Sequence, residues 1–148
     1  MSQSLTQVYV HLVFGTKNRN SWLNLEFESQ LHGLMITILV NLDCPVLIIN
    51  SVPDHVHILF RMSKNHTLAT VVAELKRKSS KWVKTIVGGA ADFHWQKGYG
   101  AFSVSSTKLD VVRRYIENQK EHHKNTSFQN EMEYFSERYG FDIKHFWD

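Results

Sequence analysis

The stretch Pro53-Asp54-His55-Val56-His57-Ile58-Leu59-Phe60 has the alternation of a β-strand with one apolar face. Successive side chains of a strand point to opposite faces, so His55 and His57 share one face while the other carries Val56, Ile58 and Phe60. Two imidazoles one pleat apart can bind one metal ion, and Zn, Mn, Fe, Co, Ni and Cu are all chemically reasonable. A pair this short also arises by chance, and taken alone it is more often part of a half-exposed surface strand.

Length and composition favour one ordinary globular domain. We expect a single domain over residues 1–148, with a core at about 5–106 and a helical part with a tail at about 107–148. The longest apolar run, 34–40, is too short to span a membrane, and the first six residues lack a signal-peptide pattern. The single cysteine, Cys44, allows neither an intramolecular disulfide nor a thiolate zinc cluster. We therefore expect a cytoplasmic protein without a membrane partner, and the net charge of +3 weakly favours a polyanionic partner.

The periodicity of the apolar residues predicts the order strand, helix, strand, strand, helix, strand. Strands are expected at 7–16, at 45–52, around His55 and His57, and at 101–106; helices are expected at 24–43, 68–87, 107–123 and 128–139. Gly88-Gly89 predicts a break, and the aromatic tail 141–147 is expected to dock, on this chain or on a second subunit. This order is the split βαβ pattern of an α+β, ferredoxin-like sandwich, with an antiparallel sheet and both main helices on one face. The other face, which carries the two histidines, is expected to be open to a ligand.

A late helical segment carries a second group of reactive side chains. Tyr115 and Gln119 are four residues apart and therefore share one face of a helix. A tyrosine hydroxyl is a poor nucleophile at its ordinary pKa of about 10, so a metal ion or nearby cations must assist it, and Arg113 and Arg114 are adjacent. The Gln119 amide oxygen can join two histidines as a neutral ligand and leave positions open for phosphate oxygens. Taken alone, Tyr115 would more often be an ordinary core residue.

Together these motifs resemble the single-tyrosine transposases of the insertion-sequence-200/605 family, which carry a histidine–hydrophobe–histidine strand. The resemblance rests on residues 11–17, 53–57, 95–105 and 115–123, which occur in the family's order and cover nearly the whole chain. It implies a transposase that cuts single-stranded DNA, in which Tyr115 attacks a scissile phosphate and leaves a 5′-phosphotyrosine link and a free 3′-hydroxyl. It also implies a divalent ion, Mg²⁺ or Mn²⁺, held by His55, His57 and Gln119. Chemistry alone would not select Mg²⁺, which prefers oxygen ligands.

The resemblance further implies a homodimer that recognises DNA hairpins, with the tyrosine acting in its own subunit or in the partner. By analogy, phosphate contacts are expected from basic residues of the second long helix, of the loop after the first strand and beside the tyrosine: Lys17, Arg19, Lys76, Arg77, Lys78, Lys81, Lys84, Arg113 and Arg114. For the cations of the long helix, a solvated surface is an equally reasonable interpretation.

Three neighbouring residues have a simpler explanation than metal chemistry. His122 and His123 are adjacent on a helix and so point about 100° apart, which favours a capping or DNA-contact role over metal ligation. Asp54 fits a turn, although it could also orient His55. Three alternative functions stay open: a non-catalytic ferredoxin-like nucleic-acid-binding module, a metal-dependent nuclease that uses water, and a domesticated relative that processes chromosomal palindromes.

Overall fold

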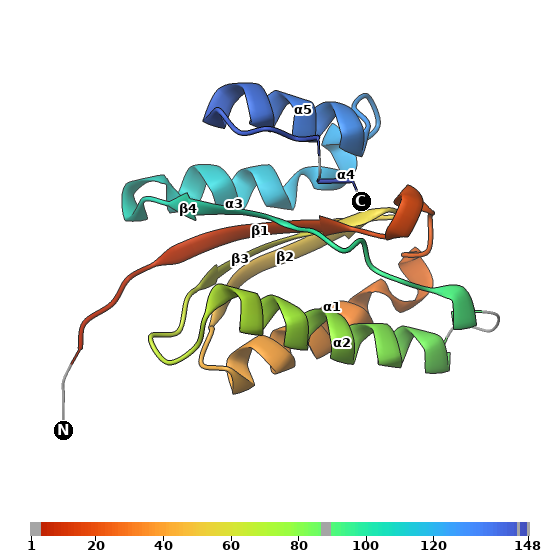
Figure 1. The fold of residues 1–148 in the computed structure, drawn as a ribbon, viewed down its shortest axis with the longest axis horizontal. Coiled ribbons are helices and arrows are strands. Elements are labelled where there is room, and N and C mark those ends of the chain that lie inside the picture. Colours follow the sequence, from red (N-terminus) through yellow and green to blue (C-terminus); the bar gives the residue numbers. More distant parts are fainter. Residues whose placement is uncertain (1–3, 87–89, 145, 148) are drawn as a thin grey trace.

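The computed structural model describes residues 4–86, 90–144, 146 and 147, and a four-stranded sheet lies between two layers of helices (Figure 1). The strands are β1 (Tyr9–Gly15), β2 (Val46–Val52), β3 (His55–Arg61) and β4 (Gly100–Val104). They lie in the order β2-β3-β1-β4, and each strand is antiparallel to its neighbours. The sequential strands β2 and β3 form a hairpin. The predicted ferredoxin-like fold class is therefore confirmed.

One face of the sheet is covered by α1 (Leu25–Asn41) and α2 (Leu68–Ile86), as the apolar periodicity predicts (Figure 1). Asn24 and Thr67 each accept a hydrogen bond from a backbone N–H in the first turn of the helix that follows. These caps satisfy donors that have no partner inside the helix, so they fix where the helices start.

The main core fills the space between the sheet and these two helices. It is built from alternate strand residues and one stripe of each helix, all at most 6% exposed: Val10, Leu12, Phe14, Val56, Ile58 and Phe60 from the strands, Leu31, Met35 and Leu39 from α1, and Val71, Val72 and Leu75 from α2. Leu25 and Ile86, at the outer ends of the helices, stay exposed. The predicted helix end at Val87 and the break at Gly88-Gly89 lie outside the described residues. Among the described helices, none is long and apolar enough to cross a membrane.

The second face of the sheet is covered as well, so the prediction of an open face is wrong. The helices α3 (Leu109–Glu117), α4 (Gln119–His122) and α5 (Phe128–Tyr139) lie over it (Figure 1). The physical reason is a second apolar cluster, which removes aromatic surface from water: Val13, Phe128, Met132 and Phe135, surrounded by Phe102, Tyr115, Phe141, Ile143, Phe146 and Trp147. The predicted docking of the tail thus occurs on its own chain.

The segment expected as one helix at 107–123 is divided at Asn118. A short 3₁₀ turn at Ser106–Lys108 leads into α3, and Asn118 has φ −92° and ψ 15° between α3 and α4. On α3, Val111 is 53% exposed, whereas Ile116 is buried. The predicted helix at 128–139 coincides with α5.

The closeness of α5 to the sheet depends on a missing side chain at Gly15. A Cβ built there would lie 2.6 Å from the ring of Phe128 and 3.0 Å from the carbonyl oxygen of Asp54. We therefore predict that Gly15→Ala lowers the free energy of unfolding by about 1–3 kcal/mol, because the ring or the backbone must shift. Thermal unfolding of the purified chain measures this.

The matched control is Gly33→Ala, in the interior of α1. A Cβ there meets nothing within 4 Å, so alanine should stabilise the chain by roughly 0.5–1 kcal/mol through its higher helix propensity. Equal melting temperatures of Gly15→Ala and the unaltered chain would contradict the close approach of Phe128.

Candidate active site and metal centre

The site is built on the face of the sheet that α3, α4 and α5 cover. His57 on β3 pairs with Val13 on β1 and with Asn50 on β2, and paired residues point to the same face. His11 is one pleat along β1 from Val13, so it also lies beside His57. The side chains of His55 and His57 are fully buried, and His11 is 6% exposed. Strand alternation therefore places three imidazoles on one covered face.

Hydrogen bonds at the Nδ1 atoms hold the imidazoles in one orientation. His55 Nδ1 is 2.7 Å from Asp54 Oδ1, and His57 Nδ1 is 2.8 Å from His11 Nε2. A fourth histidine, His123 at the end of α4, donates from Nδ1 to the carbonyl oxygen of Thr126. When a metal ion binds, a proton on each Nδ1 would leave the Nε2 lone pairs free for it, and such Nδ1 partners are typical of metal-binding histidines. Asp54 thus orients His55 in addition to forming the turn.

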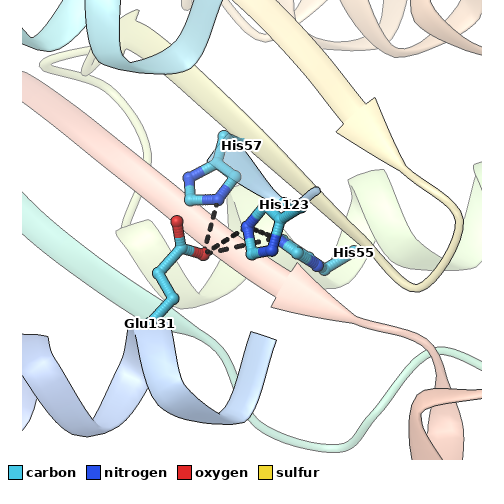
Figure 2. Close-up of side chains that lie close together, drawn as sticks. All are labelled: His55, His57, His123 and Glu131. Carbon is cyan, nitrogen blue, oxygen red and sulfur yellow. Dashed lines mark hydrogen bonds and ion pairs between the residues drawn. The ribbon is translucent and has the colours of Figure 1, made fainter. Parts of the chain in front are cut away.

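The Nε2 atoms of His55, His57 and His123 converge on the carboxylate of Glu131, which extends from α5 (Figure 2). Glu131 Oε1 is 3.1 Å from His57 Nε2, 3.3 Å from His55 Nε2 and 3.2 Å from His123 Nε2. All four ligand atoms lie within 4.8 Å of one another. Atoms that bind one ion at about 2.0–2.2 Å are about 3–4 Å apart, so this donor set fits a first-row divalent metal.

The environment of Gln119 is a second indication that a metal ion or a polar ligand binds here. It is fully buried, and its Nε2 donates to Glu131 Oε2 at 3.0 Å. Its Oε1 has no hydrogen-bond partner within the described part of the chain, and neither does Nε2 of His122. A buried amide oxygen without a partner is costly, so it calls for an ion or a polar ligand beside it. The use of Gln119 as a neutral metal ligand stays a prediction.

The Tyr115 hydroxyl lies at the same carboxylate. It donates a hydrogen bond to Glu131 Oε2, the oxygen that also accepts from Gln119. The ring of Tyr115 packs edge-on to His57 and is tilted against His122, with centroids 5.8 and 5.5 Å away. The structure therefore brings together all four residues singled out for catalysis and metal binding, which are His55, His57, Tyr115 and Gln119, within one chain.

Burial favours the neutral forms of His57 and His11. It lowers the pKa of His57 to about 4 and, together with repulsion from His57, lowers that of His11 to about 3. His55 differs: burial opposes its charge, but hydrogen bonds to Asp54 and Glu131 raise its pKa above the ordinary value. Neutral imidazole is the form that binds metals, and His57 offers it throughout the neutral range.

The pKa values of the Glu131 carboxylate and the Tyr115 phenol shift in opposite directions. Burial alone would raise the pKa of Glu131, yet attraction to His57 and hydrogen bonds from His123, His55 and His57 hold it well below its usual range. Burial, followed by the negative charge of Glu131, raises the pKa of Tyr115 above its ordinary value. In this arrangement, a neutral phenol donates to an ionised, buried carboxylate.

The helix α3, which carries Tyr115, is fixed to the edge strand β2 of its own chain. Asn50 Nδ2 donates to the carbonyl oxygen of Ile116 at 2.8 Å, and Arg113 Nη2 donates to that of Leu47 at 2.9 Å. Lys120 Nζ lies 2.7 Å from Asn50 Oδ1 and pairs with a carboxylate on α1. These contacts hold Tyr115 over β3 without a second subunit.

The basic residues predicted to contact DNA lie in several places. The cations of α2 are in the helical layer opposite to Tyr115 (Figure 1). Lys81 and Lys84 are exposed there, whereas Arg77 and Lys78 pair with Glu74. Lys17, just after β1, and Arg114, next to Tyr115 in the chain, are exposed, and the guanidinium carbon of Arg19 lies 4.9 Å from the centroid of the Trp147 ring.

Lys76 differs from the other cations of α2 because it is bonded inside the chain. Its Nζ donates to the carbonyl oxygens of Gln96 and Gly98, both at 2.7 Å, and burial lowers its pKa to about 8. The helix pattern cannot separate it from its exposed neighbours, because the carbonyls come from a distant loop. Its geometry supports a structural role.

Sequence reasoning missed Glu131 and undervalued His11 and His123. The signal for Glu131 was present: it is three residues after Phe128 and four before Phe135, on the apolar stripe of the predicted helix. A carboxylate on such a stripe must be satisfied by buried partners. The sequence favoured a capping or DNA-contact role for His122 and His123, because adjacent helical residues point about 100° apart, and in the structure His123 alone of the two joins the ligand set, at the end of α4.

The chain was compared with known proteins. A model of the family described as "Transposase IS200 like" matches residues 4–119. No curated protein matches the sequence. Among solved structures, a Deinococcus radiodurans protein assigned as a transposase superposes with a TM-score of 0.63 and 23% identity, over 80% of this chain and 98% of that one.

A second similar structure is a REP-associated tyrosine transposase bound to a REP hairpin. It has a TM-score of 0.63 and 15% identity, and the match covers 83% of this chain and 74% of the other. At these identities the two structures support the fold. The family match is broader, because it spans most of the chain and contains the two strand histidines, Tyr115 and Gln119. The chain belongs to the IS200-like transposase family.

Proposed function

We propose that the chain cuts and rejoins single-stranded DNA beside hairpins, through a 5′-phosphotyrosine intermediate. The observation that carries the proposal is the position of Tyr115, whose hydroxyl lies at the carboxylate on which three imidazole Nε2 atoms converge. A water-using nuclease has no need of a phenol at this position. A pure binding module has no need of the buried ligand set.

His55, His57 and Gln119 would hold the divalent ion. Bound there, it would polarise the scissile phosphate and stabilise negative charge on the leaving oxygen. Because the donors are mainly imidazoles, we expect Mn²⁺ to bind more tightly than Mg²⁺.

In the proposed reaction, the Tyr115 oxygen forms a bond to the scissile phosphorus, and the bond from phosphorus to the 3′-oxygen breaks. The phenolic proton passes to solvent, and the leaving oxygen takes up a proton to become a free 3′-hydroxyl. Rejoining is the reverse displacement, in which a 3′-hydroxyl attacks the phosphotyrosine. The exposed Arg114 is available to bind a phosphate oxygen during both steps.

We propose a DNA hairpin as the partner, by analogy with the hairpin named for the REP-associated transposase. Lys17, Arg19, Arg77, Lys78, Lys81, Lys84, Arg113 and Arg114 remain the predicted phosphate contacts, whereas Lys76 is better explained by its carbonyl bonds. A homodimer also stays a prediction. The contacts of α3 with β2 support a tyrosine that acts in its own subunit.

Covalent trapping tests the reaction. The purified chain with Mn²⁺ and labelled single strands carrying hairpins from the flanks of its own gene should form a band linked to protein on a denaturing gel. We predict that Tyr115→Phe abolishes this band while hairpin binding stays within about twofold, because only the hydroxyl is removed. Strand cutting by Tyr115→Phe without an adduct would favour the water-using nuclease.

Metal removal tests the ligand assignment. Chelator should abolish the adduct, and Mn²⁺ should restore it at a lower concentration than Mg²⁺ because of the imidazole ligands. Gln119→Leu, which replaces the amide by an apolar side chain of similar volume, should raise the Mn²⁺ concentration needed by about 10-fold or more. A full reaction in chelator would contradict the assignment.

Salt dependence tests the surface of α2. Replacing Lys81 and Lys84 by alanine should weaken hairpin binding and reduce the slope of log K against log salt by about two, one for each lost phosphate contact. The control is Lys124→Ala, since Lys124 is exposed but paired with Glu121 on α4. An unchanged slope in the double variant would mean that the hairpin binds elsewhere.

A further inference from the structure

Glu131 uses its two carboxylate oxygens for two different sets of partners. Oε1 faces the Nε2 atoms of His55, His57 and His123 at 3.1–3.3 Å (Figure 2). Oε2 accepts hydrogen bonds from the Tyr115 hydroxyl and from the Gln119 amide. The side chain is 1% exposed, so solvent cannot replace either set of contacts.

We propose that Glu131 is a bridging residue: Oε1 is a ligand of the metal, and Oε2 positions the Tyr115 hydroxyl beside it. The metal site would then comprise three imidazoles, one carboxylate oxygen and the Gln119 amide oxygen. Occupation of the metal site and placement of the tyrosine would be linked through a single side chain. This inference deepens the proposed function. It depends on that function only for the catalytic role of Tyr115.

The position of Glu131 is fixed by packing that is independent of its charge. Phe128, one turn earlier in α5, stacks on the ring of His55 with centroids 3.9 Å apart and 7° between the planes. Met132 and Phe135 bury the same face of α5 against the sheet. Because this packing fixes α5 on the sheet, the Glu131 carboxylate can keep both sets of contacts from a single position.

The family match gives this residue no role. It ends at residue 119, so α5 and both His123 and Glu131 lie beyond it. The segment that closes the second face of the sheet therefore also supplies two of the proposed ligands. Removing a ligand-bearing side chain, or one that orients a ligand, commonly lowers metal affinity by about 10–100-fold.

The first test measures the binding of Mn²⁺ alone to the full chain by titration calorimetry, without DNA. Glu131→Gln should weaken the affinity about 10-fold or more, because a neutral amide oxygen is a poorer ligand and its N–H₂ group cannot accept from Tyr115. The control is Glu137→Gln, an exposed carboxylate of the same helix, which should stay within about twofold. An affinity for Mn²⁺ that is unchanged in folded Glu131→Gln would overturn the ligand half of the proposal.

The second test follows Tyr115 by NMR, with ¹³C at the ring carbon that bears the hydroxyl and Zn²⁺ as a diamagnetic ion. In the unaltered chain, Zn²⁺ should shift one tyrosine signal, and Tyr115→Phe identifies it as the signal that disappears. In Glu131→Gln at saturating Zn²⁺ this shift should be lost. If the Tyr115 signal responds as before, the carboxylate does not connect the two sites and the bridging role is wrong.

A conservative variant keeps the proposal testable if Glu131→Gln does not fold. Glu131→Asp keeps the charge but is one methylene shorter, so it cannot reach the imidazoles and the hydroxyl together. It should lose either the tight Mn²⁺ binding or the tyrosine shift, and retention of both would overturn the proposal. If the unaltered chain passes both tests but forms no DNA adduct, the proposed function fails while the bridging role stands.

Discussion

The second half of the structure depends on one buried carboxylate. An ionised side chain inside a protein is costly unless several donors surround it, and Glu131 has three imidazoles on one oxygen and a phenol and an amide on the other. These donors come from β3, α3 and α4, so satisfying one charge requires that the elements meet. The same requirement makes the cluster a candidate metal centre, because the imidazole nitrogens that donate to the carboxylate when they carry a proton can bind a cation once that proton is lost.

Packing makes this arrangement possible. The face of the sheet that holds the histidines would be polar and hydrated if it were open. The aromatic residues of α5 and the tail instead form a second apolar cluster around Val13. That cluster brings α5 down onto the sheet, and Gly15 provides the space that the ring of Phe128 needs. The site is therefore enclosed by hydrophobic burial, although its own residues are polar.

The helix α3, which carries Tyr115, is anchored to a strand of its own chain. Asn50, Arg113 and Lys120 connect β2 to the helices that carry Tyr115 and Gln119, all within one chain. These contacts hold Tyr115 over the strand histidines of its own chain.

Local patterns in the sequence were sufficient to predict the fold class, both core helices and the strand that carries His55 and His57. They were also sufficient to predict that Tyr115 and Gln119 lie close together. Each of these depends on periodicity within a few residues of the chain, and such periodicity determines which side chains share a face. The sequence also placed Glu131 on an apolar stripe, but the stripe alone does not say what a carboxylate there would meet. Only the tertiary structure decided that, since Glu131 is 74 residues from His57 and 16 from Tyr115, and their convergence is set by how α5 packs on the sheet. For the same reason the bonded Lys76 and the exposed Lys81 look alike in sequence and differ in the folded chain.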